Sequence, residues 1–180
     1  GPLTGDITFD ASLGAIVLAK TGNTFSSGLN VFAYRNIVFT GGTTTFRTTA
    51  GAGSSSFDVY LHAGNGNTAG PATLNVDAGS VVNLDATSTA AVGLHIGNGK
   101  TLTNNGTMNL GGNSTVYLPT QLDAFANVTR AATLQNSGTF NNASSAGWFI
   151  LGNAGQQDGV FDNFGTASTV GGSVEGIWNN

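Results

Sequence analysis

The chain has no cysteine and few charged residues. Because cysteine is absent from all 180 residues, neither disulfides nor thiolate metal sites stabilise the fold. Charged residues make up 8% of the sequence, against roughly 25% in an average soluble domain. Lys and Arg together number 5 and the net charge is -4, which excludes the basic stripe that nucleic-acid binding requires.

Long apolar runs are also absent, although the chain is not poor in apolar residues. No run approaches the ~18 apolar residues of a membrane helix, so we expect no membrane insertion of this segment. Hydrophobic residues still make up 39% of the chain, which is enough to pack a core. Gly and Thr recur every few residues and apolar positions alternate, a pattern that disfavours helix and predicts β-strands.

Two motifs repeat along the chain with the same period. Asn-x-Gly-Thr begins at Asn104, Asn136 and Asn163, at intervals of roughly thirty residues. The stretch Leu-His-Ala-Gly-Asn-Gly at residues 61–66 returns as Leu-His-Ile-Gly-Asn-Gly at residues 94–99. Periods of this size indicate a solenoid, in which each unit buries its apolar face against its neighbours.

The repeats predict an all-β fold, a right-handed parallel β-helix (β-solenoid) that fills residues 1–180 as a single domain. We expect about six rungs of roughly thirty residues with three short strands each. The segment from Pro119 to Arg130 departs from the pattern and is expected to hold a short helical turn or a longer loop. A β-sandwich is the competing fold, but it does not require motifs at a fixed period. The residues expected to point inward from the third strands are Val31, Ala33, Val59, Leu61, Ala63, Val92, Leu94, Ile96, Val116, Leu118, Phe149 and Leu151.

The rungs of the form Leu-x-Asn-x-Gly-Thr-x-Asn-Leu, and the stretch Leu-His-Ile-Gly-Asn-Gly-Lys-Thr-Leu, carry a family resemblance. They resemble the β-helix repeats of bacterial autotransporter passengers and filamentous-haemagglutinin-like adhesins, best over residues 61–167. The resemblance implies a protein that is secreted or displayed on the bacterial cell surface, with adhesive or scaffolding work and no catalytic residue. The opening Gly1-Pro2 is interpreted as a protease remnant, so the chain is expected to be a fragment of a longer secreted repeat protein.

Alternation predicts an exposed aromatic stripe on the third strands, and this stripe is the candidate binding site. Aromatic rings suit both sugar faces and protein interfaces. The alternative is that neighbouring rings stack only to stabilise the sheet. The stripe consists of Phe32, Tyr34, Tyr60, His62, His95, Tyr117 and Trp148, with Ile150 beside the last of these.

Two other recurring residue types could suggest a function, but the sequence favours a structural role for both. The column of Asn104, Asn136 and Asn163 is expected to form hydrogen bonds along the solenoid axis at a turn. His62 and His95 occupy the same repeat position and are expected to lie one above the other. Zinc requires three or four ligands and no further ligand accompanies them, so we expect no metal and no cofactor.

The acidic residues do not form the close pair of carboxylates that glycoside hydrolysis requires, so no catalytic residue is assigned.

The leading hypothesis is a non-enzymatic extracellular surface module, an adhesin or rigid stalk segment. Its partner would be a host or environmental surface, recognised through a glycan or a protein. The first alternative is a self-assembling extracellular fibre subunit that associates end to end, because an uncapped solenoid exposes strand edges. The weakest alternative is a polysaccharide hydrolase or lyase. The candidate acidic residues are Asp10, Asp58, Asp77, Asp85, Asp123, Asp158, Asp162 and Glu175.

Overall fold

All regular structure in the described part of the chain is β-strand. The computed structural model describes residues 7–20, 29–33, 36–49, 56–63, 73–86, 90–96, 100–118, 120–122, 128–145, 148–151, 159–170, 173–174 and 177–180. In these residues no helix is present, so none is long and apolar enough to cross a membrane.

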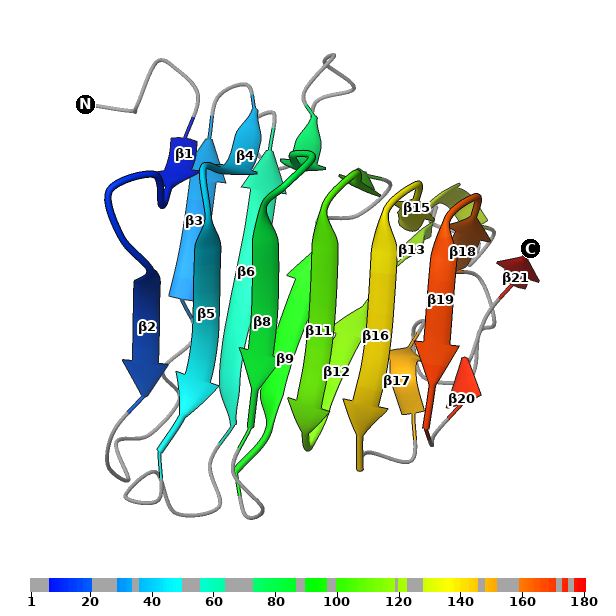
Figure 1. The fold of residues 1–180 in the computed structure, drawn as a ribbon. Helices are drawn as coiled ribbons and strands as arrows, with labels where there is room; N and C mark the ends of the chain where they lie inside the picture. Colours follow the sequence, from blue (N-terminus) through cyan, green and yellow to red (C-terminus); the bar gives the residue numbers. More distant parts are fainter. Residues whose placement is uncertain are drawn as a thin grey trace.

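The strands form three parallel sheets, and each turn of the chain contributes one strand to each sheet in succession (Figure 1). The first sheet has the order β1 (Ile7–Asp10), β4 (Ile37–Thr40), β7 (Leu74–Val76), β10 (Thr101–Asn104), β15 (Thr133–Asn136), β18 (Val160–Asn163) and β21 (Ile177–Asn179). The second sheet contains β2 (Ile16–Lys20), β5 (Thr43–Thr48), β8 (Val81–Asp85), β11 (Thr107–Gly112), β16 (Thr139–Ser144) and β19 (Thr166–Thr169). The third sheet contains β3 (Leu29–Ala33), β6 (Phe57–Ala63), β9 (Val92–Ile96), β12 (Ser114–Tyr117), β17 (Trp148–Leu151) and β20 (Ser173–Val174).

The path of the chain is right-handed. In Figure 1 the chain runs down the front through the second sheet, up the back through the third sheet, and forward over the top through the first sheet. It advances from left to right as it does so, which is the sense of a right-handed screw. The predicted right-handed parallel solenoid is therefore confirmed. The parallel pairing within all three sheets excludes a sandwich of antiparallel sheets.

The core is built from columns of apolar side chains that repeat from rung to rung. In the first sheet the register aligns Ile37, Leu74, Leu102, Leu134 and Phe161, each no more than 1% exposed. Strict alternation along each strand sends the intervening side chains outward. Burial of one such side chain contributes about 1.5–3 kcal/mol, so the columns supply the main drive for stacking the rungs.

The Asn-x-Gly-Thr turns stack as the repeat predicts. Asn104 Nδ2 donates to Asn136 Oδ1 at 2.7 Å, and Asn136 Nδ2 donates to Asn163 Oδ1 at 2.7 Å. Asn104 and Asn136 are fully buried, so this buried asparagine ladder pairs amide groups that water cannot reach, although Asn104 Oδ1 has no hydrogen-bond partner among the described residues. Gly138 follows in the same turn, and a Cβ there would collide with the backbone oxygen of Gly106 in the preceding rung. The motif therefore needs glycine because successive turns approach so closely.

Two segments differ from their predicted form. The stretch from Pro119 to Arg130 contains neither a helical turn nor a simple loop in its described part, but strands β13 (Thr120–Leu122) and β14 (Val128–Ala131), which pair antiparallel. The end of the chain, where the repeat predicts the third strand of the last rung, is divided into β20 and β21, which belong to the third and first sheets. The backbone groups of β13 and β14 pair with each other outside the three sheets, whereas β20 pairs with β17 and β21 pairs with β18.

Candidate functional sites on two faces

Three rings stack on the outer face of the third sheet. The register places Tyr60 beside His95 and His95 beside Tyr117. The ring centroids of Tyr60 and His95 are 4.3 Å apart with planes 22° from parallel, and those of His95 and Tyr117 are 4.2 Å apart at 5°. We call these residues the ring stack. Because its members cover each other's faces, the stack presents ring edges to a partner.

A carboxylate lies beside the ring stack and fixes its central member. Asp58 Oδ1 is 3.3 Å from His95 Nε2, and Ser56 Oγ donates to Asp58 Oδ2 at 2.7 Å. The hydrogen bond to His95 lowers the pKa of Asp58 below its usual range; burial opposes this effect and the hydrogen bond from Ser56 adds to it. Burial raises the pKa of Tyr117, and the negative charge of Asp58 acts in the same direction.

Glycine at position 93 makes this packing possible. A Cβ on Gly93 would lie 2.6 Å from Asp58 Oδ1 and 2.9 Å from Tyr117 Cε2. Any other residue would therefore push the carboxylate and the ring apart. The local sequence thus builds a compact cluster of two tyrosines, a histidine and an aspartate on an otherwise regular sheet.

The rest of the predicted stripe does not extend this stack in the part of the chain that the structure describes. Phe32 and His62 pair with each other through their backbones, two register positions away from Tyr60, and their side chains lie outside the described residues. Tyr34 lies outside the described residues altogether. The strand β17 carries Trp148, whose side chain is likewise not described.

The register of β17 differs from the predicted one by one residue. Leu151, and not an aromatic residue, pairs with Tyr117, while Ile150 pairs with the fully buried Val116. The side chains of Ile150 and Leu151 lie outside the described residues, so the predicted outward placement of Ile150 and inward placement of Leu151 stay predictions.

The expected superposition of the two histidines is also wrong. His95 stacks beside Tyr60, and the register pairs Leu61 with Ile96, so His62 does not lie above His95. The two copies of the second motif are therefore offset when the rungs align. Within the described residues no group of three or more His, Asp or Glu side chains could hold a metal ion.

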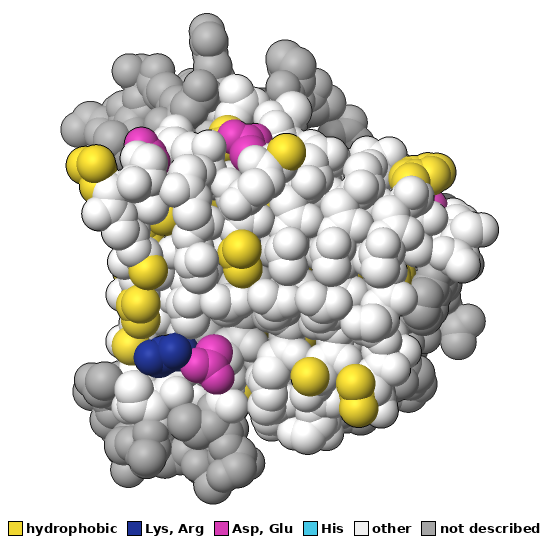
Figure 2. Space-filling model, viewed as in Figure 1, with side chains coloured by type: hydrophobic (Ala, Val, Ile, Leu, Met, Phe, Trp, Pro, Cys, Tyr) yellow, Lys and Arg dark blue, Asp and Glu magenta, His cyan; other side chains and the backbone are white. Residues whose placement is uncertain are grey.

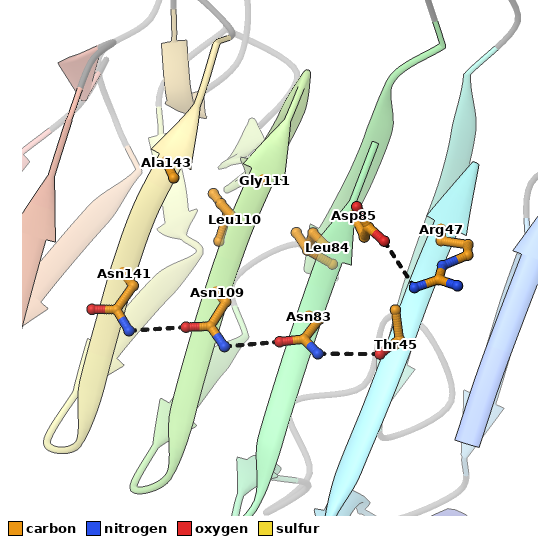
Figure 3. Close-up of a pocket in the computed structure, with 10 residues that line it drawn as sticks. All are labelled: Thr45, Arg47, Asn83, Leu84, Asp85, Asn109, Leu110, Gly111, Asn141 and Ala143. Carbon is orange, nitrogen blue, oxygen red and sulfur yellow. Dashed lines mark hydrogen bonds and ion pairs between the residues drawn. The ribbon is translucent and has the colours of Figure 1, made fainter. Parts of the chain in front are cut away.

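The outer face of the second sheet carries a row of half-buried asparagines. Asn141 Nδ2 donates to Asn109 Oδ1 at 2.9 Å, and Asn109 Nδ2 donates to Asn83 Oδ1 at 2.8 Å (Figure 3). The row is extended at one end by Thr45 Oγ1, which accepts from Asn83 at 3.2 Å, and at the other by Ser168 Oγ, which donates to Asn141 at 2.9 Å. We call Asn83, Asn109 and Asn141 the amide row.

A groove of about 320 Å³ runs beside the amide row across four neighbouring strands, β5, β8, β11 and β16. Gly111 supplies no side chain at its position, so the surface is low between Asp85 and Ala143. At one end Arg47 Nη2 contacts Asp85 Oδ2 at 2.9 Å. We call this feature the amide groove. Its lining residues, drawn in Figure 3, are Thr45, Arg47, Asn83, Leu84, Asp85, Asn109, Leu110, Gly111, Asn141 and Ala143.

Sequence reasoning did not identify the amide groove, although a signal for it was present. The triplets Val-Asn-Leu at 82–84 and Met-Asn-Leu at 108–110 recur at the same point of the rung, as does Phe-Asn-Asn at 140–142. The central asparagine of each must point outward if its neighbours are buried. The depth of the groove depends on the small residues Gly111 and Ala143, which look like ordinary turn residues in the sequence.

The fold and these two faces define a parallel β-solenoid that carries hydrogen-bonding and packing groups on its outer surfaces. Comparison of the chain with protein-family models, with curated proteins and with solved structures gives no match. The chemistry of the described side chains therefore carries the functional reasoning.

Proposed function

We propose that the chain is a non-enzymatic extracellular surface module, an adhesin or rigid stalk segment of a bacterial secreted protein. The observation that supports this function best is the in-register pairing of strands from rung to rung, which makes a stiff scaffold with long flat faces. The face in Figure 2 is covered largely by uncharged side chains, as a contact surface for a neutral partner would be. The partner in this proposal is a host or environmental surface.

The disposition of the described carboxylates supports a binding role over catalysis. Asp85 is engaged by Arg47 and Asp58 by His95, and the two lie on different sheets. Glycoside hydrolysis needs two carboxyl groups that flank one bond, roughly 5–9.5 Å apart. A polysaccharide hydrolase or lyase is therefore the weakest of the proposed functions.

A self-assembling fibre subunit is the second candidate, and the end rungs favour it. The strands β2 and β19 are the outermost strands of the second sheet. Leu13 and Val17 are exposed near β2, and Phe164 and Val170 are exposed near β19. Open strand edges with apolar side chains beside them are suited to pairing with a second copy.

The ring stack stays a candidate contact surface for the partner. Its mutual stacking favours a stabilising role, since two adjacent ring pairs are already satisfied within the sheet. A partner would contact the ring edges of the tyrosines. The test is to replace Tyr60, Tyr117 and Trp148 with Ser together and to measure adhesion of the folded variant.

One set of measurements separates the three functions. Sedimentation and electron microscopy of the purified chain are expected to show single short rods, and beads coated with the chain are expected to be retained on glycan-coated or protein-coated surfaces. Albumin-coated beads are the control. Filaments would favour the fibre subunit, and release of reducing ends or unsaturated products from a glycan panel would establish the enzyme. Single rods that adhere to no surface would contradict the adhesin.

A further inference from the structure

The amide row is a preorganised line of hydrogen-bonding groups. Each of Asn83, Asn109 and Asn141 uses one N–H and one oxygen lone pair within the row. A side-chain amide has two N–H donors and an oxygen with two lone pairs, so each residue keeps one donor and one acceptor for a ligand. The bonds along the row fix the orientation of every amide. Donors and acceptors therefore repeat at the strand spacing of about 4.8 Å without loss of side-chain freedom on binding.

The floor of the groove is apolar. Leu84 and Leu110 line it but each is only 1% exposed, so the accessible floor is mainly the Cα of Gly111 and the methyl group of the exposed Ala143. A ligand that fits has an apolar surface facing the floor and hydroxyl groups at its edge. A pyranose ring has this form, since its C–H groups lie on its faces and its hydroxyls on its rim.

The charge of the groove favours a neutral ligand. Arg47 and Asp85 form an ion pair, so together they contribute no net charge to the groove. Their side chains are 43% and 53% exposed, and the whole chain carries a net charge of -4. A polyanion such as a polyuronate or a nucleic acid would find no excess positive charge to neutralise.

A protein partner fits the groove less well than a glycan. The four strands that line it are paired on both sides within the second sheet, so no strand edge is open for an added peptide strand. Among the described residues, no aromatic side chain lines the groove to act as an anchor in a protein interface. A row of amides beside an apolar floor matches a chain of sugars, because sugar hydroxyls both donate and accept hydrogen bonds.

We propose that the amide groove binds a segment of a linear, uncharged polysaccharide, lying along the solenoid axis across β5, β8, β11 and β16. This ligand class makes the proposed function more specific. It rests on that function in one respect, namely that the sugar is held and not cleaved. The amide row binds hydroxyl groups of successive sugars, and the floor at Gly111 and Ala143 contacts the ring C–H groups. The Arg47–Asp85 pair closes one end of the groove.

The test is calorimetric titration of the whole chain with cellohexaose, xylohexaose and mannohexaose, with hexagalacturonate as the charged comparison. We expect at least one of the neutral hexaoses to bind with an affinity that does not change with salt, because no counterions are released. The charged hexamer is expected to bind at least about tenfold more weakly. The length of the recovered sugar is determined after each titration, because a shortened sugar would show that the chain had cleaved it.

Variants at the floor locate the binding. Gly111→Val fills the groove, and among the described residues other than its chain neighbours the added Cβ meets only the Leu84 backbone oxygen, at the ordinary contact distance of 3.8 Å, so the fold accommodates it. Ala143→Val fills the same groove from β16, and Ala19→Val adds the same methyl groups to an exposed alanine of the second sheet outside the groove. We expect the first two variants to lose at least about tenfold in affinity and Ala19→Val to bind as the parent does. Circular dichroism and thermal unfolding confirm that each variant is folded.

Each outcome decides between the inference and the proposed function. If the folded parent binds none of the neutral hexaoses, or if Gly111→Val binds as well as the parent, the groove is not a glycan site. Tight binding of hexagalacturonate would equally overturn the inference, because it would require net positive charge. Shortened sugar would contradict the proposed non-enzymatic function instead, whereas adhesion without hexaose binding would leave that function standing and refute the groove alone.

Discussion

Replacement of Asn136 by Ala tests how far the buried asparagine ladder stabilises the solenoid. The Asn136 side chain accepts from Asn104 at 2.7 Å and donates to Asn163 Oδ1 at 2.7 Å and to the Thr166 carbonyl at 3.1 Å. It is fully buried, so water cannot replace these partners without opening the turn. Alanine leaves two acceptors without this donor and one N–H of Asn104 without its acceptor, while the other N–H of Asn104 keeps its bond to the Thr139 carbonyl at 2.9 Å.

The expected loss follows from the cost of those unsatisfied groups. A buried acceptor left without a donor costs about 1–3 kcal/mol, so Asn136→Ala is expected to lower the free energy of unfolding by about 3 kcal/mol. Asn141→Ala is the matched control, because it deletes the same atoms from the half-exposed amide row, where water can reach the partners. Its expected loss is at most about 1 kcal/mol.

Urea unfolding followed by far-UV circular dichroism measures both variants. The slope of unfolding free energy against urea should stay unchanged, which shows that the same amount of structure unfolds. Equal losses in Asn136→Ala and Asn141→Ala would refute the reasoning, because burial would then make no difference to the cost of breaking a ladder.

Three further predictions concern the turns, the carboxylate and the ring stack. Gly138→Ala is expected to destabilise the fold by at least about 2 kcal/mol in urea unfolding, since its Cβ would meet the Gly106 backbone oxygen, whereas Gly111→Ala should cost less than about 0.5 kcal/mol. The folded-state pKa of Asp58 is lowered, so its contribution to stability is present above the unfolded pKa of about 3.9 and is lost as pH falls through the folded pKa. In unfolding measured from pH 7 down to pH 3, the stability advantage of the parent over Asp58→Asn should therefore shrink at the acidic end; a constant difference would contradict this. Tyr117→Ala removes a ring stacked 4.2 Å from His95 and should lower the unfolding free energy by about 1.5 kcal/mol, and an unchanged value would show that the stack contributes nothing.

The sequence predicted the features that repeat and missed those that depend on the length of a corner. The column of Asn104, Asn136 and Asn163 was found because identical residues recur where the backbone demands them. The register of β17 and the offset of His62 from His95 could not be found, because a corner of different length shifts a strand without changing its own pattern of alternation.

The two faces show the same division. The ring stack was predicted in part, since alternation alone places Tyr60 and Tyr117 outward, but the stacking of His95 between them required the true register. The amide groove was not predicted, because it is defined by a missing side chain at Gly111, and absence of volume at one position is visible only when neighbouring strands are aligned.

Side-chain amide signals of the isotope-labelled chain, followed by nuclear magnetic resonance during addition of cellohexaose, xylohexaose and mannohexaose in turn, test the central claim most directly. That claim is that this solenoid binds an uncharged glycan at its second sheet without cleaving it. With at least one of these sugars, the signals of Asn83, Asn109 and Asn141 are predicted to shift together, while those of the buried Asn104 and Asn136 stay in place and the sugar remains intact. Shifts confined to side-chain amides outside the amide row would contradict the account. So would the absence of any shift with about 10 mM of each neutral hexaose, because binding weaker than this would be too weak to be specific.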